Sequence, residues 1–468
     1  MTDYKLLVDG ELIDGAGSLD VINPATGEVL ATCPRADEAI LDRAVASARK
    51  AFPTWAALDH ATRSAKVLAL ADALEAKKAD FARLLVQEQG KPLQLAEYEM
   101  WQSIEMLRTI GAMELPIEVL RETAEVRIVE QRTPLGVVAA ITPWNFPMFL
   151  LMVKVAPALT AGNCLVIKPA PTTPLTTLRF GELCRDILPA GVVNVIVDQN
   201  ELGGLLTAHP DIAKVAFTGS TATGRKVMAS AAATLKRLTL ELGGNDAALV
   251  LDDADPQQVA AALFQGAMIN SGQVCLAVKR AYVPDALYDD VCAALAGIAG
   301  AAVVDDGLAQ GAQLGPLQNK AQYDKVLSLI DSAREEGTII AGGGAIDRPG
   351  YFIAPTILRD VDDDARIVRE EQFGPVLPVL RYADIDDAIA RVNDSEYGLA
   401  ASIWGRDLDR AYAIAQRIEA GTVWVNKVID LPLDMPFRGA KQSGIGVEFG
   451  REGLKEFTQA KVINMALA

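Results

Sequence analysis

Residues 214–227, "KVAFTGSTATGRKV", change character near their middle. A β-rich apolar run ends at Phe217, a turn follows over Thr218–Thr221, and a helical segment begins near Ala222–Gly224. A strand that turns directly into a helix is the unit of parallel α/β sheets, so this stretch predicts that class of fold. The backbone N–H groups at such a helix start bind phosphate, and an ordinary turn capped by Ser or Thr is the alternative interpretation.

The same alternation continues on both sides of this stretch. Residues 36–115 have apolar positions at helical spacing, and a second series of helices and strands, which begins with a predicted helix over 254–271, runs to 426. Between the two, further short apolar strands are predicted at 136–143, 164–170, 192–197 and 236–244. Strands that alternate with helices predict parallel sheets covered by helices on both faces.

Composition excludes several classes of function. The chain has 468 residues, 44 of them basic and 61 acidic, which gives a net charge of -17. Such a surface argues against nonspecific binding to nucleic acid or to an anionic membrane. The most apolar stretch, 146–167, is interrupted by Lys154 and Pro157, and the first 15 residues do not resemble a secretory signal. We therefore expect a cytoplasmic protein without a membrane span.

The cysteines predict neither a disulfide framework nor a metal site. There are five of them, widely spaced and without a CxxC pair, so a reducing compartment is expected. Cys275 lies in "INSGQVCLA", residues 269–277, directly after a turn. Taken alone it is a buried small apolar residue, and the alternative is a nucleophile. The two histidines, His60 and His209, are expected at the surface, so chemistry at Cys275 would proceed without a histidine.

Three polar residues lie at predicted strand ends, where open α/β sheets bind ligands. Lys168 follows strand 164–167 and would bind ribose or phosphate, unless it is simply solvated. Glu241 ends an apolar strand, which favours a raised pKa and a role as general base; a strand-end ion pair is the alternative. Asn145, in "ITPWNFP", would donate to an oxyanion or form an Asx turn. Together, Cys275, Glu241 and Asn145 would supply a thiol, a carboxylate base and an oxyanion donor beside the phosphate-binding turn at Gly219 and Ser220.

At this point the chain resembles the aldehyde dehydrogenase superfamily over nearly its whole length. Within the superfamily it is similar to a bacterial branch of general aldehyde dehydrogenases. The spacing of 34 residues between Glu241 and Cys275 also fits the family. The matching motifs occur in the family's order: "PWNFP", "FTGSTATG", "LELGGND", "SGQVC", "EEQFGPV", "NDSEYGLAASIW", "GTVWVN" and "KQSGIGVEFG".

The resemblance implies a reaction and a role for each matching residue. Cys275 would attack the aldehyde, Asn145 would hold the oxyanion, and Glu241 would activate the water that hydrolyses the thioester. The product is a carboxylic acid, and the hydride goes to NAD(P)+. The cofactor would be bound by Lys168 at the adenosine ribose, by Thr218, Gly219 and Ser220 at the pyrophosphate, by Glu371 and Phe373 at the nicotinamide ribose and ring, and by Trp144, Gly243 and Gly244 along its channel.

Two departures from the family pattern concern specificity. Pro171 stands where the family often has a glutamate that rejects a 2′-phosphate. Proline can neither bind the 2′-hydroxyl nor repel a phosphate, so NADP or dual use stays open, although NAD remains the first choice. Arg438 replaces a glycine near the expected substrate entrance, where it or Lys427 would attract an anionic aldehyde; a charge facing a neighbouring subunit is the alternative. We expect an apolar tunnel, and hence an apolar aliphatic or aromatic aldehyde, from Phe146, Leu150, Val153, Val274, Leu276 and Phe437.

The resemblance also implies an architecture and rival functions. We expect a Rossmann-like cofactor domain (1–115 and 135–241), a catalytic α/β domain (242–453) and an oligomerisation arm (116–134 and 454–468), in a homodimer or homotetramer. The enzyme rivals are a semialdehyde dehydrogenase, a CoA-acylating dehydrogenase, against which Glu241 argues, and an esterase that uses Cys275. A non-catalytic binding protein and a cysteine redox sensor are the rivals from other classes.

Overall fold

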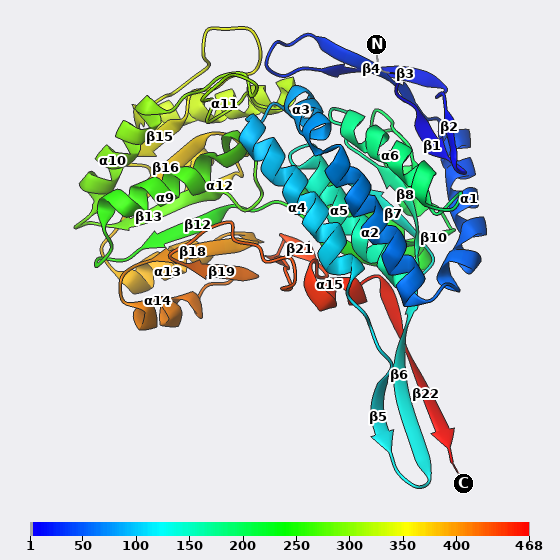
Figure 1. The fold of residues 1–468 in the computed structure, drawn as a ribbon. Coiled ribbons are helices and arrows are strands. Elements are labelled where there is room, and N and C mark those ends of the chain that lie inside the picture. The colour runs from blue at the N-terminus through cyan, green and yellow to red at the C-terminus, as the bar shows by residue number, and fades with distance from the viewer. Residues whose placement is uncertain (1–2, 468) are drawn as a thin grey trace.

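The computed structural model describes residues 3–467 and contains two large sheets (Figure 1). The first sheet has eight strands and the second has seven. In spatial order the first sheet consists of β2 (Glu11–Ile13), β1 (Leu6–Val8), β9 (Val193–Val195), β8 (Cys164–Lys168), β7 (Val137–Ile141), β10 (Ile212–Thr218), β11 (Arg237–Glu241) and β21 (Gly444–Ile445). Its five central strands (β9, β8, β7, β10 and β11) are parallel, which confirms the alternation predicted from the sequence.

Helices pack on the first sheet because their apolar faces need a partner. Helix α1 packs on β7, β8, β9 and β1, whereas α5 packs on β7 and β8 and α8 packs on β10 and β11. The helices of this half are α1 (Glu38–Ala56), α2 (His60–Ala76), α3 (Lys78–Gln89), α4 (Leu93–Gly111), α5 (Pro147–Ala161), α6 (Leu175–Ile187), α7 (Gly203–Ala208) and α8 (Thr221–Ala231), which a short 3-10 turn, η1 (Ala232–Thr234), follows.

The second sheet is parallel except for its first edge strand. Its order is β14 (Thr338–Ala341), β15 (Thr356–Arg359), β16 (Val376–Tyr382), β13 (Val278–Pro284), β12 (Asp246–Val250), β18 (Ala400–Trp404) and β19 (Thr422–Val425). Successive residues of β12 enter two different hydrophobic clusters, one on each face, as expected for a sheet buried on both sides. The surrounding helices are α9 (Pro256–Met268), α10 (Tyr288–Ala301), α11 (Lys320–Glu336), α12 (Arg366–Arg369), α13 (Ile385–Asn393) and α14 (Leu408–Ala415).

The helix predicted over 254–271 ends earlier in the structure. Helix α9 stops at Met268, and a 3-10 turn, η2 (Ile269–Gly272), continues to the residues before Cys275. Asn270 and Ser271 have φ values of 52° and 54°, so they cannot extend a right-handed helix. The apolar periodicity of the sequence did not indicate that the backbone changes here from right-handed to left-handed conformation.

Part of the segment 242–453 returns to the first sheet. Strand β21 lies antiparallel to β11, with Gly444 opposite Glu241, and Leu242 donates a backbone hydrogen bond to Ser443 (2.9 Å). Helix α15 (Gly450–Lys455) then packs on α4 and α5. The strand covers the edge of β11, which would otherwise expose unpaired backbone groups. The segment predicted as the catalytic domain therefore contributes to both sheets.

Smaller elements complete the fold. A three-stranded arm projects from the body (Figure 1) and consists of β5 (Glu118–Glu122), β6 (Val126–Pro134) and the C-terminal β22 (Thr458–Ala466). Two-stranded sheets are formed by β3 (Gly17–Ile22) with β4 (Val29–Arg35), and by β17 (Tyr397–Gly398) with β20 (Ala440–Lys441). Among residues 3–467, no helix combines the length and apolarity needed to cross a membrane.

Asn163 joins the base of the arm to the body. Its side chain is fully buried; Oδ1 accepts from the N–H groups of Leu135 (2.7 Å) and Gly136 (3.0 Å). Its Nδ2 donates to the carbonyl oxygens of Phe457 (2.8 Å) and Ala158 (3.3 Å). One amide therefore satisfies backbone groups of β6, α5 and the approach to β22.

Asn163→Ala is expected to lower the free energy of unfolding by about 3 kcal/mol, because it leaves several buried backbone groups without partners. Urea denaturation monitored by circular dichroism measures the change. The exposed Gln94→Ala on α4 is the control and should change stability by less than about 0.5 kcal/mol. A similarly small effect for Asn163→Ala would contradict the role given to this amide.

Candidate active site

A cavity of about 180 Å³ lies at the carboxyl ends of the parallel strands. Ten residues singled out from the sequence line it: Trp144, Asn145, Leu150, Thr218, Gly219, Ser220, Gly243, Cys275, Glu371 and Phe373. They come from the ends of β7, β10 and β11, from helix α5, and from the loops after η2 and α12. Sequence reasoning missed four further lining residues: Pro143, Leu242, Gln322 and Lys325.

The loop before Cys275 has an unusual backbone. Asn270, Ser271 and Gly272 are consecutive residues with positive φ, which costs about 1–3 kcal/mol for each non-glycine residue. The hydroxyl of Ser271 donates to the carbonyl of Gly315 (2.7 Å), and a side chain at Gly272 would collide with the carbonyl of Gly374. The loop is thus held by packing, with Cys275 partly exposed to the cavity.

Asn145 is fixed from both its side chain and its backbone. Its Nδ2 donates to the carbonyl of Gln273 (3.0 Å), two residues before Cys275. Its own carbonyl accepts from Lys91 Nζ (2.8 Å) and from Asn270 Nδ2 (3.0 Å). An amide anchored in this way beside a thiol can serve as a preorganised hydrogen-bond donor to developing negative charge.

The anchor of Asn145 continues to a buried ion pair that the sequence did not reveal. Lys91 Nζ lies 2.5 Å from Glu99 Oε2, and both side chains are fully buried. The other oxygen of Glu99 accepts from the backbone N–H groups of Met148 (2.9 Å) and Phe149 (3.2 Å), in the first turn of α5. The sequence gives only weak signals for this ion pair, because "GKP" and an acidic residue in a helix are both common patterns.

Glu241 is buried beside the cavity, at the end of β11 and opposite Thr218 of β10. Within residues 3–467 its Oε1 has no hydrogen-bond partner. Burial raises the pKa of this carboxyl well above its usual range, the charge of Glu448 raises it further, and the charge of Lys154 opposes the rise. A buried carboxyl with a raised pKa and a free oxygen is suited to accept a proton near neutral pH.

Lys154 is a further residue that reasoning from the sequence did not assign to the site. Its Nζ donates to the hydroxyl of Thr218 (2.7 Å) and pairs with Glu448 (2.9 Å), and its side chain is fully buried. A single lysine inside the apolar helix α5 was the available signal. Glu448 reaches this position because the segment around β21 returns to the first sheet.

Cys275 is surrounded by acidic groups. Burial raises the pKa of its thiol, and the carboxyl groups of Asp246, Glu241 and Glu371 raise it further. The resting sulfur is therefore the protonated thiol at neutral pH. The other cysteines, Cys33, Cys164, Cys184 and Cys292, are buried.

Glu371 and Phe373 form the opposite wall of the cavity. Glu371 Oε1 accepts from the N–H of Gly244 (2.9 Å), and Lys325 Nζ donates to the carbonyl of Glu371 (2.7 Å). A Cβ atom at Gly243 would lie 2.9 Å from Glu371 Oε2, so a larger residue there would displace the Glu371 carboxylate. The ring of Phe373 meets that of Trp144 edge-on, with centroids 5.3 Å apart.

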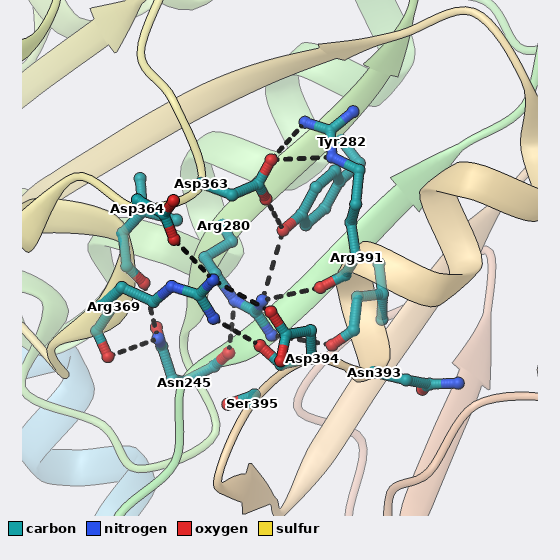
Figure 2. Close-up of polar contacts among 12 residues, drawn as sticks. Asn245, Arg280, Tyr282, Asp363, Asp364, Arg369, Arg391, Asn393, Asp394 and Ser395 are labelled. Atoms are coloured by element: carbon teal, nitrogen blue, oxygen red, sulfur yellow. Dashed lines mark hydrogen bonds and ion pairs between the residues drawn. The ribbon is translucent and has the colours of Figure 1, made fainter.

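A polar network holds the segment that leads to Glu371 (Figure 2). Asn245 Nδ2 donates to the carbonyl of Val368 (2.8 Å), and Arg280 Nε donates to the carbonyl of Asn245 (3.0 Å). In the same cluster Arg391 pairs with Asp363 (2.7 Å). The network ties α12 to β12 and β13, and so fixes the position of Glu371 relative to Gly244.

Lys168 lies outside the cavity lining and is paired. Its Nζ lies 2.5 Å from Asp198 Oδ1, and both side chains are buried at the ends of neighbouring strands. The second oxygen of Asp198 accepts from the N–H of Leu202 (2.8 Å), just before α7. Pro171 follows in the loop after β8.

The residues expected to form a tunnel are spread over several environments. Leu150 lines the cavity, and Val274 and Leu276 are buried on either side of Cys275. Val153 instead lines a second, small cavity under α15, because its side of α5 faces Phe449 and Leu454. The remaining two, Phe146 and Phe437, contact Lys91 Nζ (3.6 Å to the ring centroid) and the ring of Phe449 (centroids 5.9 Å apart) respectively.

Two charges near the end of the chain are at the surface. Arg438 is exposed, whereas Lys427, also exposed, pairs with Asp430 (2.5 Å). The charge of Lys427 is therefore largely neutralised by its neighbour.

Comparison with known proteins adds an independent line of evidence. Residues 13–463 match the model of the aldehyde dehydrogenase family. The chain is 39% identical to a phenylacetaldehyde dehydrogenase of Pseudomonas fluorescens, over 99% of this chain and 96% of the relative.

Two solved structures show the same fold. The structure of betaine aldehyde dehydrogenase from Staphylococcus aureus in complex with NAD+ matches with a TM-score of 0.97 at 33% identity, over 99% of this chain and 95% of that one. An NADP-dependent enzyme of E. coli matches with a TM-score of 0.97 at 35% identity, over 99% and 98% of the two chains. These matches confirm the fold predicted from the resemblance, and the chain belongs to the aldehyde dehydrogenase family.

Proposed function

We propose that this protein oxidises an aldehyde to a carboxylic acid with NAD(P)+. The observation that carries the proposal is one cavity lined by a thiol, an anchored amide and an aromatic wall, with a buried carboxyl of raised pKa beside it. Family membership supports this class of reaction, in which each residue of the site has a distinct role.

The residues around the cavity fit a dinucleotide. The side chain of Ser220 caps helix α8, which begins at Thr221, so the N-terminal N–H groups of the helix lie at the cavity edge where a pyrophosphate would bind. The glycine at 243 leaves room between β11 and Glu371, and Phe373 and Trp144, which meet edge-on, provide an aromatic wall. When bound, the nicotinamide ring accepts the hydride from the substrate carbon. Lys168 is assigned to the adenosine ribose.

Cys275 begins the reaction when its thiol gives up its proton to solvent and its sulfur adds to the aldehyde carbon, which gives the anion of a thiohemiacetal. The carbonyl oxygen becomes negative, and it is held by Asn145 Nδ2 and by the backbone N–H of Cys275. Because Asn145 is already fixed by Lys91 and Asn270, little reorganisation is needed when this charge develops. Loss of hydride from the same carbon leaves a thioester on Cys275.

Glu241 completes the cycle by removing a proton from the water that attacks the thioester. The unpaired Oε1 is free to accept this proton, and the raised pKa makes the carboxylate a stronger base than an exposed glutamate. Lys154 stabilises the Glu241 carboxylate before it takes the proton, whereas the negative charge of Glu448 favours the protonated form afterwards. The proton then passes from Glu241 to the leaving sulfur, so the carboxylic acid is released and Cys275 is again a thiol.

The substrate proposed first is an apolar aliphatic or aromatic aldehyde. Leu150 on the cavity wall and the aromatic residues Phe146 and Phe437 support this class, as does the phenylacetaldehyde dehydrogenase among the relatives. Exposed Arg438 favours a semialdehyde as the second candidate. A CoA-acylating enzyme would need no water-activating base, so the position of Glu241 argues against it.

We also propose that the arm joins copies of this chain into a homodimer or homotetramer. Strand β5 is an edge strand of the arm, and Val119 and Leu120 on it are about half exposed. An edge strand with exposed apolar residues is stabilised by pairing with another sheet. The cofactor-binding part would then comprise residues 1–115 and 135–241, with the catalytic residues following from 242.

The first test is the reduction of NAD+ or NADP+, followed by near-UV absorbance with aliphatic, aromatic and carboxylated aldehydes. Cys275→Ala should abolish reduction, and Asn145→Ala should lower kcat by about 10²–10³-fold, because the donor to the oxyanion is lost. Cys33→Ala, at a buried cysteine in the first half, is the control and should keep kcat. Failure of the native protein to reduce either cofactor with any aldehyde would overturn the proposal.

Glu241→Gln should separate the two halves of the reaction. The first turnover should still produce one equivalent of reduced cofactor per site, whereas steady-state turnover should fall about 10²-fold or more, since the thioester lacks its base. In the native enzyme kcat should rise with pH as Glu241 loses its proton, with a midpoint well above the usual value near 4.5. Stopped-flow absorbance measures both, and loss of the first turnover would contradict this role.

The buried pair of Lys168 and Asp198 predicts a preference for NAD+ over NADP+. Asp198 already neutralises the lysine, and its carboxylate would repel a 2′-phosphate placed beside it. Asp198→Asn should raise the ratio of kcat/KM for NADP+ to that for NAD+ about tenfold. The matched control is Glu201→Gln, an exposed acid nearby that pairs with Arg35 and should leave the ratio unchanged. An unchanged ratio in Asp198→Asn would refute the prediction.

A further inference from the structure

Lys279 is the extra residue of a β-bulge beside the candidate active site. In the pairing of β12 with β13, Asp246 lies opposite Val278 and Ala247 lies opposite Arg280, which leaves Lys279 without a place in the ladder. Bulges redirect a side chain and are frequent next to active sites. While Arg280 turns into the network of Figure 2, Lys279 turns to the loop that carries Cys275.

The ammonium group of Lys279 is buried without a salt bridge. Its side chain is fully inaccessible, and no ion pair within residues 3–467 includes it. Its Nζ donates to the carbonyl of Gly272 (2.5 Å) and lies 5.9 Å from the ring centroid of Phe373. A buried cation without a paired anion is costly, so its retention calls for a use.

The charges that face Lys279 are those of the active site. The carboxyl groups of Glu371 and Asp246 and the sulfur of Cys275 favour its charged form, whereas Lys325 of α11 opposes it. Burial dominates and lowers the pKa of Lys279 to about 8, so the ammonium is mostly charged at neutral pH. On the other side, Cys275 faces three carboxyl groups, which all disfavour a thiolate.

Histidine does not supply a counter-charge. His60 begins α2, and His209 ends α7 with its ring 3.6 Å from Asp42, in the first half of the chain and away from the cavity lining. Lys279 is therefore placed to offset the acidic surroundings of the thiol. A cation acting through this low-dielectric region affects the thiol more strongly than one in water would.

We propose that Lys279 is a positioning residue that supplies the fixed positive charge for the thiolate of Cys275 and holds the loop before it through the carbonyl of Gly272. The inference rests on the proposed function of Cys275 as nucleophile. It assigns to a lysine the part that a histidine plays beside many reactive cysteines.

The test compares two replacements of Lys279 that separate charge from hydrogen bonding. Lys279→Gln keeps a donor for the carbonyl of Gly272 but removes the charge, and Lys279→Arg keeps the charge. The probe is iodoacetamide, from which the thiolate displaces iodide. Its rate of reaction with cofactor-free enzyme is followed over pH by mass spectrometry of the peptide that contains Cys275, with Cys275→Ala as the background.

Lys279→Gln is expected to slow alkylation of Cys275 about tenfold at pH 7, where Lys279 is charged, which corresponds to a rise of about one unit in the pKa of the thiol. Because the pKa of Lys279 is about 8, the difference from the native protein should fade above that pH. Lys279→Arg should stay near the native rate at pH 7. Lys214→Gln, which removes another buried lysine with a pKa near 8 from strand β10, is the matched control and should not change this rate.

An unchanged rate at pH 7 in Lys279→Gln overturns the proposal, as does an equal decrease in Lys214→Gln. If Lys279→Gln fails to fold, the decision passes to Lys279→Ala refolded with and without methylammonium: recovery of fast alkylation supports the charge, and its absence with restored folding refutes it. None of these measurements uses aldehyde or nucleotide. A failure of the proposed oxidation is thus distinguishable from a failure of this inference.

Discussion

The left-handed run from Asn270 to Gly272 is the constraint on which the site depends. It bends the chain out of α9 and sets Cys275 at the edge of a cavity formed by both halves of the molecule. A backbone of this kind persists only where its surroundings determine it. Here the surroundings are the carbonyl of Gly374, against which Gly272 packs, and the contacts of Ser271 and Asn270. The loops that bear Phe373, Asn145 and Cys275 are therefore positioned by one another.

Electrostatics at this site follow from an excess of buried carboxyl groups. Glu241, Asp246 and Glu371 lie close enough to raise the pKa of the thiol, and burial raises the pKa of each of them. The cations nearby are held by specific contacts: Lys154 by Glu448 and Thr218, and Lys279 by a single carbonyl. At rest, such a site favours the protonated, neutral forms of the thiol and the carboxyl groups. This holds until a substrate or cofactor brings new charge into the cavity.

Much of the architecture and of the cavity lining follows from local sequence. The strand, turn and helix around Ser220, and the polar residues at strand ends, are determined by short-range preferences and by the geometry of parallel sheets. These suffice to bring Asn145 and Ser220 to one edge. Cys275, which precedes β13 rather than following a strand, was assigned by resemblance, as were Phe373 and Glu371, whose loop has no periodic pattern.

The contacts that support the site could not be derived in the same way. Lys91 reaches Asn145 across 54 residues, and Lys154 reaches Glu448 across 294, so neither pair leaves a local pattern. No sequence pattern singled out Asp198, because its role depends on its contact with Lys168 in the folded chain. Lys279 depends on a single-residue bulge, which shifts a side chain from one environment to another without changing the strand's composition. Contacts between distant residues and local irregularities of the backbone are thus the features that could not be predicted from the sequence.

The return of the chain through β21 has a consequence for biosynthesis. Glu448 lies 294 residues after Lys154, and β21 follows β11 only after all the strands of the second sheet, yet Glu448 and β21 complete the environment of Glu241 and Lys154. A nascent chain that has already exposed Cys275 still lacks the acid that pairs with Lys154. Cys275 is thereby made long before the surroundings of Glu241 are complete, and synthesis of the segment around β21 is the step that completes the site.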